Sequence, residues 1–191
     1  MEIRVEIYDP TSKTFWQTGN ITETAGRADP TATLLHDGRV LVTGGLNAVG
    51  SSATTDIYDP ISGTFSKGPN MSTSRFSHTA ILLSDGRVLI AGEANSGKLT
   101  AEFFDPTTNV FSQALDIIAD FTTVFVGVRF KDGRAFIVGS NITELYDPSG
   151  NIFRVFNLIG IRSRCHQPSN ARKPKLVKSA AEISSNYGVL S

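Results

Sequence analysis

Three aspartates at equivalent positions are the first residues in this sequence with the chemistry of a catalytic or metal site. Asp37, Asp85 and Asp132 recur at separations of 48 and 47 residues, and each is followed by Gly and Arg. Each Asp-Gly pair lies between two short apolar runs, which predicts a hairpin whose tight type I′ turn needs φ > 0 at both central residues. Carboxylates at separate turns do not converge, so no general acid and base pair is expected.

The other reactive groups are scattered along the chain. The three histidines are His36, His78 and His166, and the single cysteine is Cys165. One cysteine excludes an internal disulfide framework and any multi-thiolate metal site. Glycines such as Gly44-Gly45 follow a strand without the spacing and helix start that a phosphate-binding loop needs. We therefore expect no catalytic residue, no metal site and no cofactor.

A second unit alternates with the Asp-Gly turns and occurs four times. An acidic residue, an apolar one and an aromatic precede Asp-Pro, and a Phe follows seven residues after that aromatic; the copies begin at Glu6, Asp56, Glu102 and Glu144. Proline ends a strand, and the Asp before it can bond the turn backbone. Gly or Asn stands four residues beyond the Asp in three copies, as a left-handed turn position requires, and Lys13 is the exception. The aromatic and the Phe should pack together from neighbouring strands.

Each repeat thus predicts four strands within 42 to 50 residues, which is the size of a propeller blade. Arg75, His78 three residues later, an apolar strand, a second strand closed by glycine and the two spaced aromatics resemble the kelch repeat of galactose-oxidase-type propellers. The first repeat keeps Arg27 but has Pro30 at the histidine position, and the third has Thr122 and Phe125. The resemblance implies an all-β fold, an incomplete kelch-type β-propeller of about three and a half four-stranded antiparallel blades plus an irregular tail.

The repeat also predicts the organisation of the chain. We expect a partial propeller over residues 2–156, made of a half blade at 2–18 and blades at about 27–67, 75–113 and 122–156. Residues 157–191 hold six basic residues and one acidic one, and contain no Asp-Gly turn. This tail is expected to be irregular, with at most a short helix around Leu176 to Ile183.

Galactose-oxidase-like propellers can hold a copper radical site made of histidines, tyrosines and a cysteine crosslinked to one tyrosine. Here Tyr8, Tyr58 and Tyr146 occupy repeated structural positions, and Cys165 lies in the tail. The sequence therefore argues against the copper site.

By resemblance, the predicted function is a noncatalytic kelch scaffold that binds a protein or carbohydrate ligand and is a fragment of a larger propeller. The motif nominates Arg27, Arg75 and His78 for binding; the alternative is that they make structural hydrogen bonds between blades. A piece of a galactose-oxidase-like or carbohydrate-active enzyme, with its catalytic residues on other blades, is a second interpretation. A self-associating module with exposed blade faces is a third.

The overall composition limits the classes of partner that we expect. Lys plus Arg equals Asp plus Glu at 18 each, so no overall field attracts nucleic acid. No apolar run approaches the 18 or so residues of a membrane span. The N-terminus alternates charged and apolar residues, which predicts a strand and not a signal peptide. The localisation is unknown, although the resemblance favours an extracellular setting.

Overall fold

The computed structural model describes residues 5–23, 26–93, 99–114, 124–139 and 143–156, and in these ranges every regular element is a strand. The strands are β1 (Glu6–Asp9), β2 (Thr14–Gln17), β3 (Thr31–Leu34), β4 (Val40–Thr43), β5 (Leu46–Asn47), β6 (Gly50–Ser51), β7 (Thr55–Asp59), β8 (Thr64–Lys67), β9 (Thr79–Leu82), β10 (Val88–Glu93), β11 (Leu99–Asp105), β12 (Val110–Gln113), β13 (Val124–Arg129), β14 (Ala135–Gly139), β15 (Thr143–Asp147) and β16 (Ile152–Phe156). The predicted all-β fold is confirmed. No helix in these ranges could cross a membrane.

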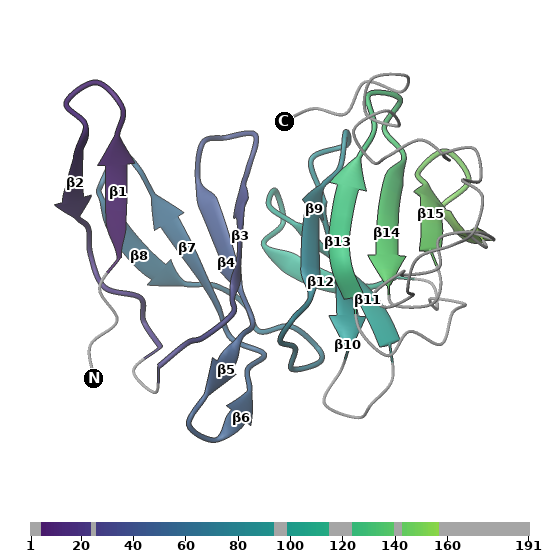
Figure 1. The fold of residues 1–191 in the computed structure, drawn as a ribbon, viewed down its shortest axis with the longest axis horizontal. Helices are drawn as coiled ribbons and strands as arrows, with labels where there is room; N and C mark the ends of the chain where they lie inside the picture. The colour runs from purple at the N-terminus through teal and green to yellow at the C-terminus, as the bar shows by residue number, and fades with distance from the viewer. Residues whose placement is uncertain (1–4, 24–25, 94–98, 115–123, 140–142, 157–191) are drawn as a thin grey trace, which may run out of the picture.

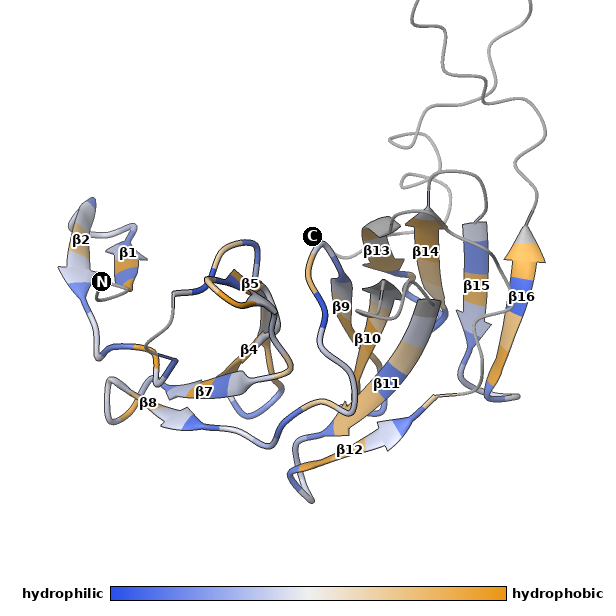
Figure 2. Ribbon diagram, turned by 90° about the horizontal axis from the view of Figure 1, so that it is seen from below, coloured by the Kyte–Doolittle hydropathy of each residue, from blue (hydrophilic) through white to orange (hydrophobic). Residues whose placement is uncertain are grey.

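The strands form antiparallel sheets that repeat one plan. In the described residues there are three four-stranded sheets, β3-β4-β7-β8, β9-β10-β11-β12 and β13-β14-β15-β16, and β1-β2 forms a separate two-stranded sheet. The first strands of the blades, β3, β9 and β13, contact one another in turn. Figures 1 and 2 show the sheets following one another along an arc. This is the expected arrangement of one half blade and three complete blades.

Apolar side chains fill the spaces between the three complete blades. One buried cluster joins the second and third blades and includes Leu89, Phe103 and Ile137. A second cluster joins the first and second blades and includes Leu41 and Ile90. Residues 88–91 of β10 have no exposed surface, as a strand covered on both faces requires. The apolar run at residues 88–91 is thus covered on both faces of the sheet.

The Asp-Pro turns and the aromatic pairs agree with the prediction. The fourth residue beyond each Asp has a left-handed backbone, with φ of 57° at Lys13, 68° at Gly63, 58° at Asn109 and 48° at Asn151. The Asp59 carboxylate accepts the N–H two residues on at 2.8 Å. The paired rings lie 4.9–5.1 Å apart between centroids in all four copies. Lys13 therefore takes the same conformation as the glycine and asparagines.

The type I′ turn predicted at the Asp-Gly pairs is wrong. Only the glycine has a positive φ, 89° at Gly38, 90° at Gly86 and 91° at Gly133. The Gly38 N–H donates to the Leu35 carbonyl (3.1 Å), and the Leu35 N–H donates to the Arg39 carbonyl (2.8 Å). The loop thus has three residues, with an ordinary turn followed by a left-handed glycine, because the residue before the Asp also belongs to it.

Several sequence predictions fall outside the described residues. They include the tail at 157–191 with its helix at 176–183, Cys165, His166 and Thr122. The domain boundaries drawn from the repeat stay a prediction.

Candidate functional site at the blade junctions

Arg75 occupies a closed polar site between the first and second blades. Its side chain has 0% exposure, and Nη2 lies 2.8 Å from Oε1 of Glu102, which is 1% exposed. The guanidinium also donates to the carbonyls of Gly92 (2.9 Å) and Thr100 (2.7 Å) and to the Thr100 hydroxyl (2.7 Å). The second oxygen of Glu102 accepts the Ser72 N–H at 2.6 Å. A charge this deeply buried is tolerated because its donors are satisfied within the protein.

Arg27 repeats this arrangement one blade earlier. Its Nη2 lies 2.9 Å from Oδ2 of Asp56, and both side chains are fully buried. The same nitrogen donates to the Thr54 hydroxyl at 2.6 Å, and Thr22 donates its backbone N–H to Asp56 at 2.9 Å. Burial lowers the pKa of Arg27 from its ordinary value, while the charges of Asp56 and Glu23 act in the opposite direction. Asp56 and Glu102 hold equivalent places in the repeated unit. The same buried ion pair therefore recurs in two successive blades.

His78 connects the second blade to the first. Its Nε2 lies 2.9 Å from the Thr31 hydroxyl of β3 and 3.0 Å from the Thr43 hydroxyl of β4. Burial, followed by the charge of Arg75, lowers the pKa of His78 to about 4. The imidazole is therefore neutral at pH 7, and its described contacts lie between blades.

The glycine doublet after β4 explains how closely the blades approach. Gly45 donates its N–H to the Arg75 carbonyl at 2.8 Å, and Arg75 donates its N–H to Ser52 at 3.0 Å. A Cβ on Gly44 would lie 2.6 Å from the Arg75 carbonyl oxygen and 2.7 Å from the His78 ring. Only glycine leaves room for this junction.

A short exposed turn follows each buried arginine. Asp29 and Ser77 stand two residues after Arg27 and Arg75, and both are exposed with a left-handed backbone, φ 50° and 48°. Non-glycine residues in this conformation carry strain that the surrounding structure must hold. The two turns lead into β3 and β9, which contact each other. Equivalent exposed turns thus precede two innermost strands that contact each other.

The structure places the three nominated residues at one type of junction. Arg75 and His78 share the junction between the first two blades, and Arg27 lies at the corresponding place in the first blade. The acidic partners Asp56 and Glu102 were missed by sequence reasoning, although their constant place two residues before the aromatic was the available signal. In the described residues no cluster of three or more His, Cys, Asp or Glu side chains forms a metal site. Binding by the nominated residues stays a prediction.

Comparison with known proteins gives one family match. The family model described as the Kelch motif matches residues 29–72, from the exposed turn before β3 to the loop before Arg75. No curated protein matched the chain. Kelch repeats generally form noncatalytic modules that bind proteins.

Proposed function

We propose that this chain, which is a partial kelch-repeat propeller, is a noncatalytic scaffold that binds a protein through the exposed turns at the start of its innermost strands. The observation that carries the proposal is the pair of equivalent strained turns at Asp29 and Ser77, each two residues after an arginine whose side chain is buried in an ion pair. Strain retained at exposed positions is a common property of binding surfaces. In a larger propeller, each further blade would have a turn of this kind before its innermost strand.

The buried residues have a positioning role in this proposal. The side-chain hydrogen bonds of Arg27, Arg75 and His78 all go to other parts of the chain, although Arg27 Nε and His78 Nδ1 have no partner, so these residues fix the turns that a partner would touch. Direct contact of these three side chains with a ligand would require the junctions to open. The exposed residues Asp29 and Ser77 would therefore contact the partner, and the buried residues would stabilise the fold.

The test separates recognition from stability. A protein captured with the wild-type chain is titrated against a variant carrying Asp29→Lys and Ser77→Lys, and against Arg75→Lys. We expect the surface variant to weaken binding by about tenfold or more with only a small fall of its unfolding midpoint, and Arg75→Lys to lower the midpoint by more. Unchanged affinity in the surface variant would refute the proposal.

Asp29→Asn, which keeps the preference for a left-handed backbone, is the matched control. Binding to a glycan array without any protein partner would favour a carbohydrate ligand instead.

A further inference from the structure

An open groove lies between the outer strand β2 of the half blade and the first blade. It has a volume of about 310 Å³, and its lining includes Ile7, Asp9, Trp16, Thr18, Tyr58 and Gly63. We propose that this groove binds a trimethylammonium group, held by the indole face of Trp16 and the negative charge of Asp9. This inference does not depend on the function proposed above.

Trp16 supplies the aromatic surface of the groove. It is the single tryptophan of the chain, is 59% exposed and pairs with Ile7 across the β1-β2 hairpin. The same position of the outer strand is also exposed in the three complete blades, where it holds Ser66, Ser112 and Arg154. Exposure is therefore common to this position, and the tryptophan is what distinguishes the half blade. Among aromatic side chains, an indole face attracts a cation most strongly.

Gly63 opens the opposite wall of the groove. The second and third blades have Asn109 and Asn151 at this turn position. In the third blade the Tyr146 hydroxyl donates to Oδ1 of Asn151 at 2.8 Å. Gly63 has no side chain to make this bond with Tyr58. The space beside the Tyr58 ring is therefore left to the groove.

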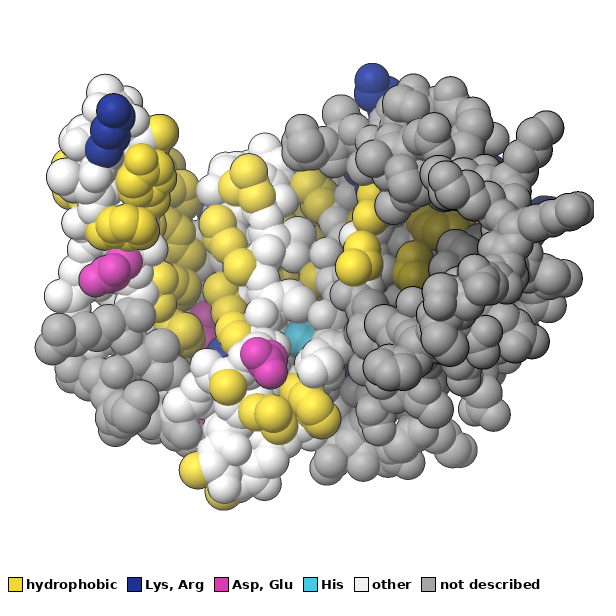
Figure 3. All heavy atoms as spheres, in the orientation of Figure 1, with side chains coloured by type: hydrophobic (Ala, Val, Ile, Leu, Met, Phe, Trp, Pro, Cys, Tyr) yellow, Lys and Arg dark blue, Asp and Glu magenta, His cyan; other side chains and the backbone are white. Residues whose placement is uncertain are grey.

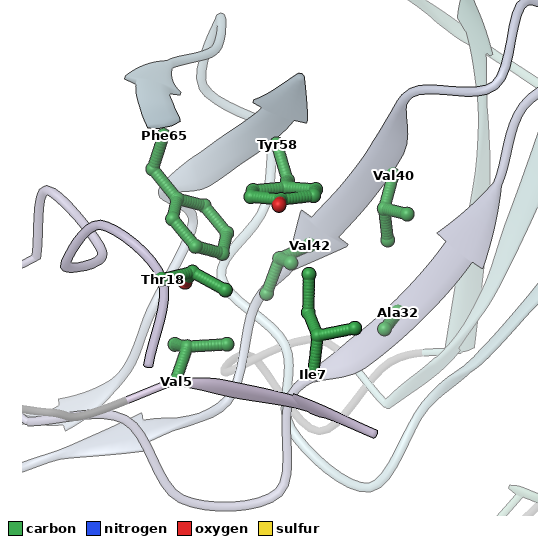
Figure 4. A pocket seen from close by; sticks show the side chains of 8 residues that line it. All are labelled: Val5, Ile7, Thr18, Ala32, Val40, Val42, Tyr58 and Phe65. Carbon is green, nitrogen blue, oxygen red and sulfur yellow. The ribbon is translucent and has the colours of Figure 1, made fainter. Parts of the chain in front are cut away.

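The inner end of the groove is apolar. Ile7, Thr18 and Tyr58 also line a neighbouring cavity of about 300 Å³, whose other lining side chains are all hydrophobic. Figure 4 shows these three side chains pointing into the space between the half blade and the first blade, and Figure 3 shows hydrophobic side chains along the same gap. A ligand in the groove thus lies against methyl and ring carbons.

The charge of the groove favours a cation. Of the described residues that line it, Asp9 alone carries a charge. Both oxygens of its carboxylate already accept hydrogen bonds within the turn, Oδ1 from the Thr11 N–H (2.8 Å) and Oδ2 from the Ser12 hydroxyl (2.7 Å). The Thr18 hydroxyl likewise donates to the Gly19 carbonyl at 2.9 Å. The groove thus offers a negative charge and few free hydrogen-bonding positions.

A trimethylammonium group matches these properties. Its charge is spread over methyl groups and it has no N–H to donate, so it needs an aromatic face, apolar contact and a nearby negative charge. A sugar or a primary ammonium has donors that must find new acceptors when they leave water, and the groove has already used most of its own. Choline-like molecules and phosphocholine lipids both carry the group.

The test uses the full chain with choline as the probe. Saturation transfer from the protein to the choline methyl protons measures binding by NMR, at constant ionic strength because salt screens exposed charges. We expect saturable binding with a Kd of roughly millimolar order. The neutral tert-butyl analogue of choline, in which carbon replaces nitrogen, should bind about fivefold or more weakly. Trp16→Leu should weaken choline binding by about tenfold, and Asp9→Asn by about threefold.

A second variant closes the groove without removing either binding group. Gly63→Asn restores the side chain of the other blades at a φ of 68°, close to the 58° of Asn109 and the 48° of Asn151, so the turn should be kept. The added amide would occupy the space beside Tyr58, and we expect choline binding to fall by about tenfold or more. Ser66→Ala, at the outer-strand position of the first blade, is the matched control and should leave binding unchanged.

Three results would overturn the proposal. They are no saturation transfer to choline, equal binding of choline and its neutral analogue, and unchanged binding in both Trp16→Leu and Gly63→Asn while circular dichroism shows that the variants are folded. Phosphatidylcholine vesicles distinguish the two sources of the group. Vesicle binding that choline competes away would assign it to a lipid, and choline binding without vesicle binding would assign it to a free small molecule.

Discussion

Nε2 of His78, at the start of the second blade, lies 2.9 Å from the hydroxyl of Thr31 in the innermost strand of the first. The same nitrogen lies 3.0 Å from Thr43 in the adjacent strand. One imidazole, next to the start of β9, thus contacts two strands of the neighbouring blade. Because an unpaired repeat cannot bury its face alone, such contacts between neighbours contribute to the stability of the whole array.

Acidification should weaken this junction. The folded pKa of His78 is about 4, below the 6.5 of an unperturbed histidine. The neutral-imidazole contribution to the free energy of unfolding is therefore complete above about pH 6.5 and is lost as the pH falls toward 4. We expect a loss of about 3 kcal/mol across this window, since one pKa unit corresponds to about 1.4 kcal/mol. Urea unfolding at several pH values measures it.

The matched control is the exposed histidine. His36→Gln should keep the pH slope, whereas His78→Gln should flatten it between about pH 6.5 and 4. An unaltered slope in His78→Gln would show that other groups cause the dependence.

Removing one partner of a buried ion pair should be far more harmful than removing a surface one. Arg75→Ala strands the buried Glu102 carboxylate, and we expect a loss of about 3–5 kcal/mol of unfolding free energy. Arg39→Ala removes an exposed pair with Asp37, so its cost should stay near or below 1 kcal/mol. The double variant Arg75→Met with Glu102→Met should recover part of the loss, because no lone charge remains. Equal effects of the two alanine substitutions in urea unfolding would contradict this account.

The repeat allowed the strand plan to be predicted because its signals are local. Asp-Pro, the left-handed position after it and the two spaced aromatics each act within one hairpin, and all were found in the structure. The type of the Asp-Gly turn was wrong because loop length depends on where the flanking strands stop pairing. Leu35 and Arg39 bond across the loop, so three residues separate the strands and not two.

The site was harder to predict because its contacts join distant segments. Arg27 and Arg75 were found through their place in the motif, but their partners Asp56 and Glu102 lie 29 and 27 residues away. Which acid meets which arginine depends on the stacking order of the strands. The contact of His78 with Thr31 spans 47 residues and two blades, and no local pattern encodes it.

Lys13 is the residue that violates the repeat at the Asp-Pro turns, and replacing it should stabilise the half blade. Its φ of 57° costs a residue with a Cβ about 1–2 kcal/mol, while glycine loses somewhat more chain entropy on folding. Lys13→Gly should therefore gain about 0.5–1 kcal/mol. Trp16 fluorescence during urea unfolding reports on this hairpin directly. Lys13→Ala should change little, and Gly63→Ala at the equivalent turn should be destabilising. A lower midpoint for Lys13→Gly would mean that the lysine side chain makes a contribution that outweighs its backbone strain.

Gly45 should be far harder to replace than a glycine in an open turn. Its φ is 102°, and a Cβ would lie 2.5 Å from the Ala28 carbonyl oxygen. Gly38 has a similar φ of 89° with nothing within 4 Å of the added atom. Gly38→Ala therefore measures the backbone cost alone, about 1–2 kcal/mol, and Gly45→Ala should cost about 1–3 kcal/mol more because the strands must move apart. Faster amide exchange at Gly45, whose N–H donates to Arg75, should accompany that loss. Equal costs for the two substitutions in urea unfolding would show that the junction can relax around a methyl group.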